Sequence, residues 1–365
     1  MPLPTPDTRS NVSSKNKPDP DLSRDYILGC SRPDSDDKSG FFQFKTDKHL
    51  LSIAPTRTGK GRGLILPNLL NLPDHSVFVI DPKGENALVS AEYRRDVLGN
   101  DILIFNPYRI FEKEFNDLGF TQFQTFNPLA NLNPESRDFA DDVANIAEAL
   151  IYDETGGDSH WVQAARGYVE FLIMFLVTDP EEQANKTVTL GRLWEIIARG
   201  YSGLIDIHKS ENSEPTDSIL DKAAKSSSHL VQVNAGRYAS ETAEVHSLIA
   251  TAETQTKIFK SEVICLALEG EKFNFEDMKD RKTSVYLILP SKFLITQARY
   301  LRLVLLVAMS QFMSGEKGNH QVVMMLDEFA NLGALNIIAN GYGLIAGHGV
   351  TLWSFVQNLT KKPLS

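Results

Sequence analysis

The sequence predicts an α/β fold with a mostly parallel sheet, interrupted by an inserted all-helical segment. Short apolar runs alternate with helical stretches in residues 25–134 and again in residues 258–365. The runs are continuously apolar, which is typical of strands that are covered on both faces of a parallel sheet. Between them, residues 135–257 lack strand signals and carry apolar residues at three- and four-residue steps, as amphipathic helices do.

The composition is that of a globular protein with a sizeable core. The chain has 365 residues, of which 42% are hydrophobic and 23% are charged. A formal net charge of −10 argues against a surface that coats nucleic acid all over, although a locally basic channel is compatible with it. Two cysteines without metal-ligand spacing, and no apolar stretch of membrane-spanning length, predict a reduced, cytoplasmic chain.

The chain divides by composition into four parts. Residues 1–24 are polar and Pro-rich, and they predict a disordered tail. Residues 25–134 and 258–365 are expected to form two parts of one sheet domain, and residues 135–257 an all-α insertion. Strands are expected at 49–53, 76–82, 101–107, 283–290, 321–328 and 350–357. Helices are expected at 85–98, 138–151, 160–177, 190–199, 218–235, 240–257, 296–313 and 335–346.

The run APTRTGKG at 54–61 lies between a predicted strand and a predicted helix. In this context successive backbone N–H groups and the positive end of a helix converge on one point, where an anion is stabilised. Gly59 allows a close backbone approach, and Lys60 would reach the outer phosphates of a nucleotide. Ala54 and Gly61 depart from the strict phosphate-loop pattern. A glycine turn with a solvated lysine is the alternative interpretation.

Polar side chains follow several predicted strands at the point where each strand ends. Asp81 and Asn106 follow two of them, Asp327 and Glu328 end a third, and Gln357 ends the last. The carboxyl ends of parallel strands share one edge, so these residues are expected near the loop. Nucleotide hydrolysis needs a carboxylate near magnesium and a group that orients water. A solvated acidic pair and a glutamine that merely closes a strand stay open as alternatives.

Several motifs in order carry a resemblance to a known family. They are APTRTGKG at 54–61, GLILPNLL at 63–70, VIDPKGEN at 79–86, LDEFANLG at 326–333 and GYGLIAGHGVTLWSFVQNL at 341–359, with DSHW at 158–161 before a helix. Together they resemble the TraG/TraD-type coupling proteins of conjugation and type IV secretion, which belong to the FtsK/HerA-like pumping ATPases. The resemblance covers residues 28–359.

The resemblance implies a RecA-like P-loop NTPase domain that uses ATP and Mg²⁺. Carried over residue by residue, Lys60 would bind the β- and γ-phosphates and Asp327 would act through magnesium as the metal ligand. Asp327, Glu328 and Gln357 form the implied catalytic set, with Glu328 acting on the water and Gln357 as a sensor. The implied nucleotide-binding residues are Pro55, Thr56, Arg57, Thr58, Gly59, Lys60, Gly61 and Arg62.

The resemblance also implies a motor that hands relaxase-bound single-stranded DNA, or an effector protein, to a type IV secretion channel. A homo-hexamer is the implied assembly, at the cytoplasmic face of the inner membrane. Lys83 and Glu85 match the family's DPKGE stretch without an assigned role, and an acidic helix start is the other interpretation. The given sequence does not contain the family's membrane-spanning helices or its later strands, so a fragment, a natural truncation or a soluble paralogue is expected.

Two other functions compete with this motor. One is a non-hydrolysing adaptor that recruits relaxase or effector proteins through the all-α segment. The other is a motor of the same group that acts on chromosomal or phage DNA without a secretion channel. Phosphate release by the purified protein distinguishes the adaptor from either motor.

Overall fold

A six-stranded parallel sheet organises the chain. The computed structural model describes residues 25–30, 41–55, 58–152, 159–205, 217–327 and 343–357. The sheet has the strand order β3-β8-β7-β4-β6-β5, and every neighbouring pair is parallel, which confirms the predicted sheet. Its strands are β3 (Leu50–Ile53), β4 (Ser76–Ile80), β5 (Asp101–Phe105), β6 (Thr283–Leu287), β7 (Val322–Leu326) and β8 (Val350–Val356).

Burial along the strands explains the continuous apolar runs in the sequence. Every residue of β4, β6, β7 and β8 is buried, whereas the outer strands β3 and β5 are partly exposed. Strands with both faces covered favour apolar or small side chains on both faces, so the usual alternation of apolar and polar residues disappears. The strands that come before the helical stretch in sequence and the strands that come after it interleave within one sheet.

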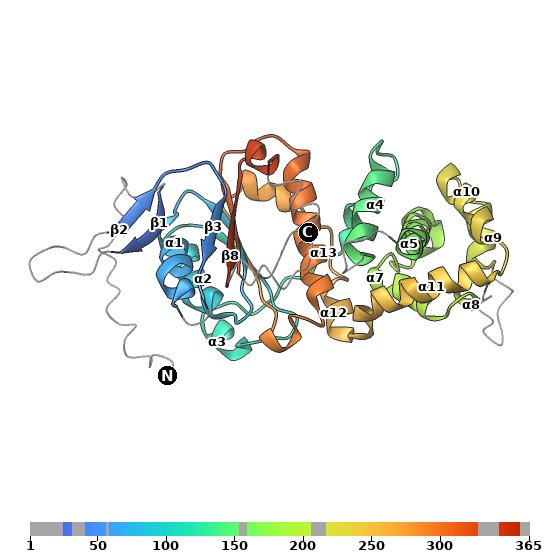
Figure 1. Cartoon of the computed structure of the whole chain (residues 1–365), viewed down its shortest axis with the longest axis horizontal. Helices are drawn as coiled ribbons and strands as arrows, with labels where there is room; N and C mark the ends of the chain where they lie inside the picture. Colours follow the sequence, from blue (N-terminus) through green and yellow to red (C-terminus); the bar gives the residue numbers. More distant parts are fainter. Residues whose placement is uncertain are drawn as a thin grey trace, which may run out of the picture.

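Helices cover both faces of this sheet (Figure 1). One face packs against a π-helical turn (Gly61–Ile65), α1 (Leu66–Asn71), α2 (Glu85–Asp96) and α3 (Glu112–Asp117). The opposite face packs against α13 (Ala298–Ser314), whose side chains are buried along most of its length. The side chains of every strand except the edge strand β3 thus divide between two apolar clusters, one on either side.

Between α3 and β6 the described residues with regular structure are helical, and this part of the chain is called the helical region. It extends to one side of the sheet (Figure 1). Its α-helices are α4 (Phe139–Leu150), α5 (His160–Thr178), α6 (Pro180–Ala184), α7 (Leu190–Ala198), α8 (Ser202–Ile205), α9 (Ile219–Ala224), α10 (His229–Tyr238), α11 (Ala243–Thr256) and α12 (Glu262–Ala267). Helix α4 packs against α13, which joins this region to the sheet. The predicted domain boundaries remain predictions.

The predicted helix at 218–235 is wrong as a single element. The structure has two helices there, α9 and α10, separated by residues 225–228. Three consecutive serines occupy the break, and the Ser226 hydroxyl accepts a hydrogen bond from the Ser228 N–H at 3.2 Å. Serine side chains compete with the helical backbone for hydrogen bonds, which ends α9 and lets α10 begin in a new direction.

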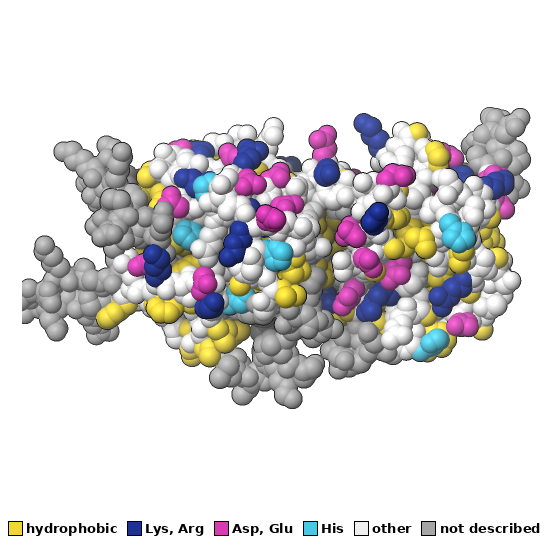
Figure 2. All heavy atoms as spheres, turned by 90° about the horizontal axis from the view of Figure 1, so that it is seen from above, with side chains coloured by type: hydrophobic (Ala, Val, Ile, Leu, Met, Phe, Trp, Pro, Cys, Tyr) yellow, Lys and Arg dark blue, Asp and Glu magenta, His cyan; other side chains and the backbone are white. Residues whose placement is uncertain are grey.

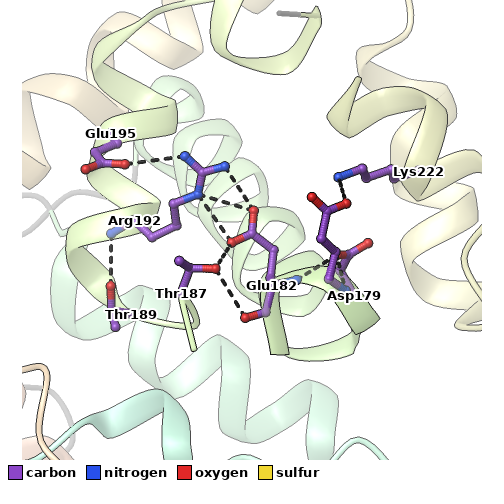
Figure 3. A network of polar contacts seen from close by, with 8 residues as sticks. Asp179, Glu182, Thr187, Thr189, Arg192, Glu195 and Lys222 are labelled. Atoms are coloured by element: carbon purple, nitrogen blue, oxygen red, sulfur yellow. Dashed lines mark hydrogen bonds and ion pairs between the residues drawn. The ribbon is translucent and has the colours of Figure 1, made fainter. Parts of the chain in front are cut away.

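A polar network ties α6, α7 and their connection together (Figure 3). The side chain of Glu182 is 9% exposed and accepts from the Arg192 guanidinium, with an Nη2–Oε1 distance of 3.0 Å. The Thr187 hydroxyl contacts the same carboxylate, and Arg192 also reaches Glu195 at 3.3 Å. A carboxylate this buried is stabilised only when such donors compensate its lost hydration. The network therefore fixes the turn between the two helices.

An antiparallel hairpin of β1 (Tyr26–Cys30) and β2 (Phe41–Phe44) precedes the sheet and was not predicted. The Asn68 side chain of α1 accepts from the Ile27 N–H and donates to the Ile27 carbonyl, both at 2.8 Å. Tyr26 is buried and packs edge-on against Trp353 of β8, with ring centroids 5.7 Å apart. The hairpin is therefore held by α1 and by the sheet.

Arg94 of α2 is fully buried and caps the C-terminal end of α1, the helix that follows the phosphate-type loop. Its guanidinium donates to the carbonyl oxygens of Leu69 at 2.6 Å and His75 at 2.8 Å, and to the Ser284 hydroxyl at 2.6 Å. Carbonyls at a helix C-terminus carry the negative end of the helix dipole, which suits a cation. Burial lowers the pKa of Arg94 to about 10. Arg94 thus fastens α1 to β6.

None of the helices in the described ranges is long and apolar enough to cross a lipid bilayer.

Candidate active site

The phosphate-type loop begins where β3 ends. The Ala54 N–H donates to the Val356 carbonyl at 2.9 Å, so the loop leaves the sheet beside β8. Lys60 stands at the start of the π-helical turn, and Gly59 has a φ of +88°, which only glycine adopts without strain. The Thr58 hydroxyl donates to the Pro55 carbonyl at 2.7 Å and closes the turn. Among the predicted loop residues, Thr56 and Arg57 lie outside the described ranges.

The backbone of this loop is open to a ligand. A Cβ added to Gly59, Gly61 or Gly63 would meet no atom of the described chain within 4 Å. The Gly63 N–H donates to the Gly59 carbonyl at 2.7 Å, which folds the loop back onto the helix start. π-helical turns are uncommon and occur frequently at functional sites. Glycines with open space at a helix N-terminus fit a phosphate group.

Lys60 and Asp327 are brought together from positions far apart in the sequence. The Lys60 Nζ lies 2.9 Å from Asp327 Oδ1, and the two side chains are 14% and 17% exposed. Asp327 follows directly after β7, which pairs with β8, and β8 pairs with the loop strand β3. Glu328, the second predicted carboxylate, lies outside the described residues.

Gln357 directly follows β8, the strand that separates β3 from β7. Val356 pairs with Ile53 of the loop strand, and Ser354 pairs with Leu326 of the carboxylate strand. Gln357 therefore leaves the sheet between the loop and Asp327, at the same edge. This position is the one that a sensor of the terminal phosphate needs, and the sensor role itself stays a prediction.

Asp81 follows β4 on the other side of Asp327, since Ile80 pairs with Leu326. It is 1% exposed, and its carboxylate accepts from the Ala87 N–H at 2.9 Å and from the Asn86 side chain at 3.2 Å. Burial, and secondarily the charge of Asp327, raises the pKa of Asp81 to about 7. Sequence analysis placed Asp81 at this edge and assigned it no role. The structure shows that it anchors the start of α2 beside the ion pair.

Three other polar residues that the sequence singled out, Asn106, Lys83 and Glu85, are not part of the ion pair. Asn106 shares the sheet edge but follows β5, at the opposite end of the strand order from β3. Its side chain bonds only its own loop in the described chain, accepting from the Ile110 N–H at 3.0 Å and donating to the Ile110 carbonyl at 2.8 Å. These two hydrogen bonds give Asn106 a structural role in its own loop. Lys83 and Glu85 are exposed around the turn after β4.

A magnesium ion would find the carboxylate of Asp327 here, beside the buried Asp81, whose carboxylate already accepts hydrogen bonds from the start of α2. In the described ranges, no group of three His, Cys, Asp or Glu side chains could hold a metal ion by itself. Magnesium usually binds one or two protein carboxylates and completes its shell with water and substrate phosphates, which a single Asp327 satisfies. The described donors thus fit magnesium held jointly with a nucleotide.

These features define the class of the protein: a RecA-like α/β protein with a phosphate-type loop at the carboxyl edge of its sheet. The sequence profile of the family described as "Type IV secretory system Conjugative DNA transfer" matches residues 14–362. The chain belongs to this family, the TraG/TraD-type coupling proteins, which confirms the resemblance.

Individual relatives agree with this membership. The conjugal transfer protein TraG of Escherichia coli is 24% identical over 98% of this chain and 55% of its own length. VirD4 of Rhizobium radiobacter is 25% identical over 86% of this chain and 42% of its own length. The chain therefore spans about half the length of the curated relatives that it matches.

Solved structures show the same fold. The conjugative coupling protein TrwB superimposes with a TM-score of 0.61 at 14% identity, over 87% of this chain and 65% of that one. TrwB in complex with ADP and Mg²⁺ gives a TM-score of 0.59 at 14% identity, over 86% and 65% of the two chains. At this identity the likeness establishes the fold alone.

Proposed function

We propose that this chain is a subunit of an ATP-driven motor that delivers relaxase-bound single-stranded DNA or protein to a type IV secretion channel. The observation that carries the proposal is the 2.9 Å contact between Lys60 and Asp327 beside an open glycine loop. A cation for phosphate and a carboxylate for magnesium are the two groups that nucleotide hydrolysis needs at one point. Nucleotide and magnesium binding by the related TrwB supports the proposal.

The residues would divide the work by position. The backbone N–H groups of the loop, from Pro55 to Arg62, would cradle the phosphates at the helix start. The Lys60 ammonium would exchange Asp327 for the β- and γ-phosphate oxygens, because both compete for the same cation. Asp327, once released, would hold magnesium, which when bound neutralises charge on those oxygens.

Hydrolysis transfers the γ-phosphoryl group to a water molecule and breaks the bond to the bridging oxygen of the β-phosphate. Glu328 would orient that water and take its proton, and Lys60 would offset the charge that develops on the phosphate oxygens. Gln357, at the end of β8, would contact the terminal phosphate and report its presence to the strand. These three roles are part of the proposal.

The substrate and the assembly are also part of the proposal. Single-stranded DNA with its relaxase, or an effector protein, is the proposed cargo, and a homo-hexamer at the cytoplasmic face of the membrane is the proposed working form. On the face seen in Figure 2, acidic and basic side chains are interspersed. This face does not offer the clustered cations that phosphate binding needs, and a channel between subunits is the proposed route for DNA.

Phosphate release by the purified protein tests the proposal, with and without single-stranded DNA. We expect Lys60→Ala and Glu328→Gln to abolish release, whereas Lys113→Ala on the exposed surface of α3 leaves it unchanged. Equal release in all four proteins would refute the motor function. Release in none of them, with the fold intact, would favour a non-hydrolysing adaptor.

A further inference from the structure

A chain of buried polar side chains runs between α2 and the sheet. Ser90 and Arg94 of α2, with Ser284 and Tyr286 of β6, are fully buried beside the apolar residues that cover this face of the sheet. Replacing two hydrogen-bonded buried groups by apolar groups of the same shape is often neutral or stabilising. Stability alone therefore does not account for this chain of polar groups.

One end of the chain reaches the helix that follows the phosphate-type loop. The Arg94 guanidinium donates through Nη1 to the Leu69 carbonyl of α1 and through Nε to the Ser284 hydroxyl, both at 2.6 Å. Lys60 stands at the other end of the same helical segment, where the π-helical turn begins and continues into α1. A rigid helical segment thus lies between Arg94 and the loop.

The chain continues from β6 back to α2. Tyr286 lies two residues after Ser284 on β6, so both side chains are on the same face of the sheet. The Tyr286 hydroxyl lies 2.7 Å from Ser90 Oγ. Ser90 has one hydroxyl proton and donates it to the Asn86 carbonyl at 2.6 Å. The Tyr286 hydroxyl is therefore the donor to Ser90 Oγ, which fixes the direction of this hydrogen bond.

The other end of the chain reaches the carboxylate edge of the sheet. The Asn86 Nδ2 donates to Asp81 Oδ1 at 3.2 Å. Asp81 and Asp327 directly follow a paired position of the neighbouring strands β4 and β7. The Lys60 Nζ lies 2.9 Å from Asp327 Oδ1. The loop and the carboxylate edge are thus connected twice, directly by the ion pair and through the core by the buried chain.

We propose that Tyr286 and Ser90 are positioning residues of the nucleotide site. They act through Asp81 and hold the carboxylate of Asp327 at a fixed place beside Lys60. When the phosphates take the lysine from the carboxylate, the buried chain would keep the two halves of the site at the separation that Mg–ATP needs. Hydrogen-bonded groups behind a site commonly fix its geometry in this way. This role rests on the proposed nucleotide site, and the ion pair allows it to be tested without a nucleotide.

Tyr286→Phe removes one hydroxyl from the chain, and Ser90→Ala removes the group that it contacts. Tyr168→Phe is the matched control, because Tyr168 of α5 is also fully buried and its hydroxyl has no hydrogen-bond partner among the described residues. Urea unfolding of Lys60→Ala, Asp327→Asn and the double variant measures the coupling of the ion pair in each background. We expect this coupling to fall to about half or less in Tyr286→Phe and to stay unchanged in Tyr168→Phe.

Hydrolysis of Mg–ATP gives a second measurement that a purely structural role would not affect in the same way. Tyr286→Phe and Ser90→Ala should each lower kcat about tenfold and change KM by less than about twofold, because exact positioning matters most in the transition state. Their double variant should lose no more than either single variant, since the two hydroxyls act as one unit. Losses that add in the double variant would overturn the proposed role.

The ion-pair coupling separates failure of this role from failure of the proposed function. The same coupling in folded Tyr286→Phe as in the wild type would overturn the role, and so would an equal fall in Tyr168→Phe. A coupling that falls only in Tyr286→Phe, in a wild-type chain that neither binds nor hydrolyses Mg–ATP, would confirm the positioning of Asp327 and would refute the nucleotide site instead.

Discussion

The ion pair between Lys60 and Asp327 predicts a measurable coupling energy in the folded protein. Two unit charges 2.9 Å apart attract by about 6 kcal/mol at an effective dielectric constant of about 20. Desolvation offsets much of this, because the side chains are only 14% and 17% exposed. A net coupling of about 2 kcal/mol follows, between the values of exposed and buried pairs.

A double-mutant cycle with Lys60→Ala, Asp327→Asn and the double variant measures this coupling by urea unfolding. The same cycle on the more exposed Lys222–Glu181 pair of the helical region is the control, for which we expect less than about 1 kcal/mol. Coupling at Lys60–Asp327 should persist at high salt, since partly buried pairs are screened weakly. A coupling no larger than that of the control pair would refute the convergence of loop and carboxylate.

Three further predictions concern stability. Asp81→Asn should raise the free energy of unfolding by about 2–4 kcal/mol above pH 7 and by little below pH 4. The reason is that a carboxyl group whose pKa is raised to about 7 in the folded protein destabilises the native state as the pH rises from about 4 to about 7. Equal pH profiles of the wild type and the variant in urea unfolding would contradict this. Arg94→Met should cost about 3 kcal/mol, because it removes the donor of buried carbonyls. Arg95→Met, at the neighbouring and partly exposed position, should cost less than about 1 kcal/mol. Similar shifts in unfolding temperature for the two variants would disprove this. Gly59→Ala should lower the free energy of unfolding by about 1–2 kcal/mol, because Gly59 has a φ of +88°. Gly61→Ala should leave it unchanged, because Gly61 has space for a Cβ and no positive φ. Equal denaturant midpoints for the two variants would argue against the loop geometry.

The sheet could be predicted from the sequence because its signals are local. The six expected strands are mostly apolar runs, and two covered faces favour that pattern in every central strand. The spatial order of the strands could not be predicted, since β8 enters between β3 and β7 through packing that no single segment encodes. The hairpin of β1 and β2 was missed because Asn68, on a distant helix, fixes Ile27.

The part of the candidate site that lies in recognisable sequence motifs could be predicted. Lys60 and Asp327 were paired from the loop pattern and from the shared edge of parallel strands, and the structure brings them together. Asn106 met the same edge criterion and proved structural, because position along the edge depends on strand order. The anchoring of α2 by Asp81 depends on a turn in the chain, whose only sequence signal is an aspartate followed by proline and glycine.

Calorimetric titration of Mg–ATP into the purified chain tests the central claim most directly. We predict saturable heat at one site per chain, lost in Lys60→Ala and retained in Lys113→Ala. No heat in the folded wild-type chain, or the same heat after Lys60 is removed, would contradict a nucleotide site built on Lys60 and Asp327.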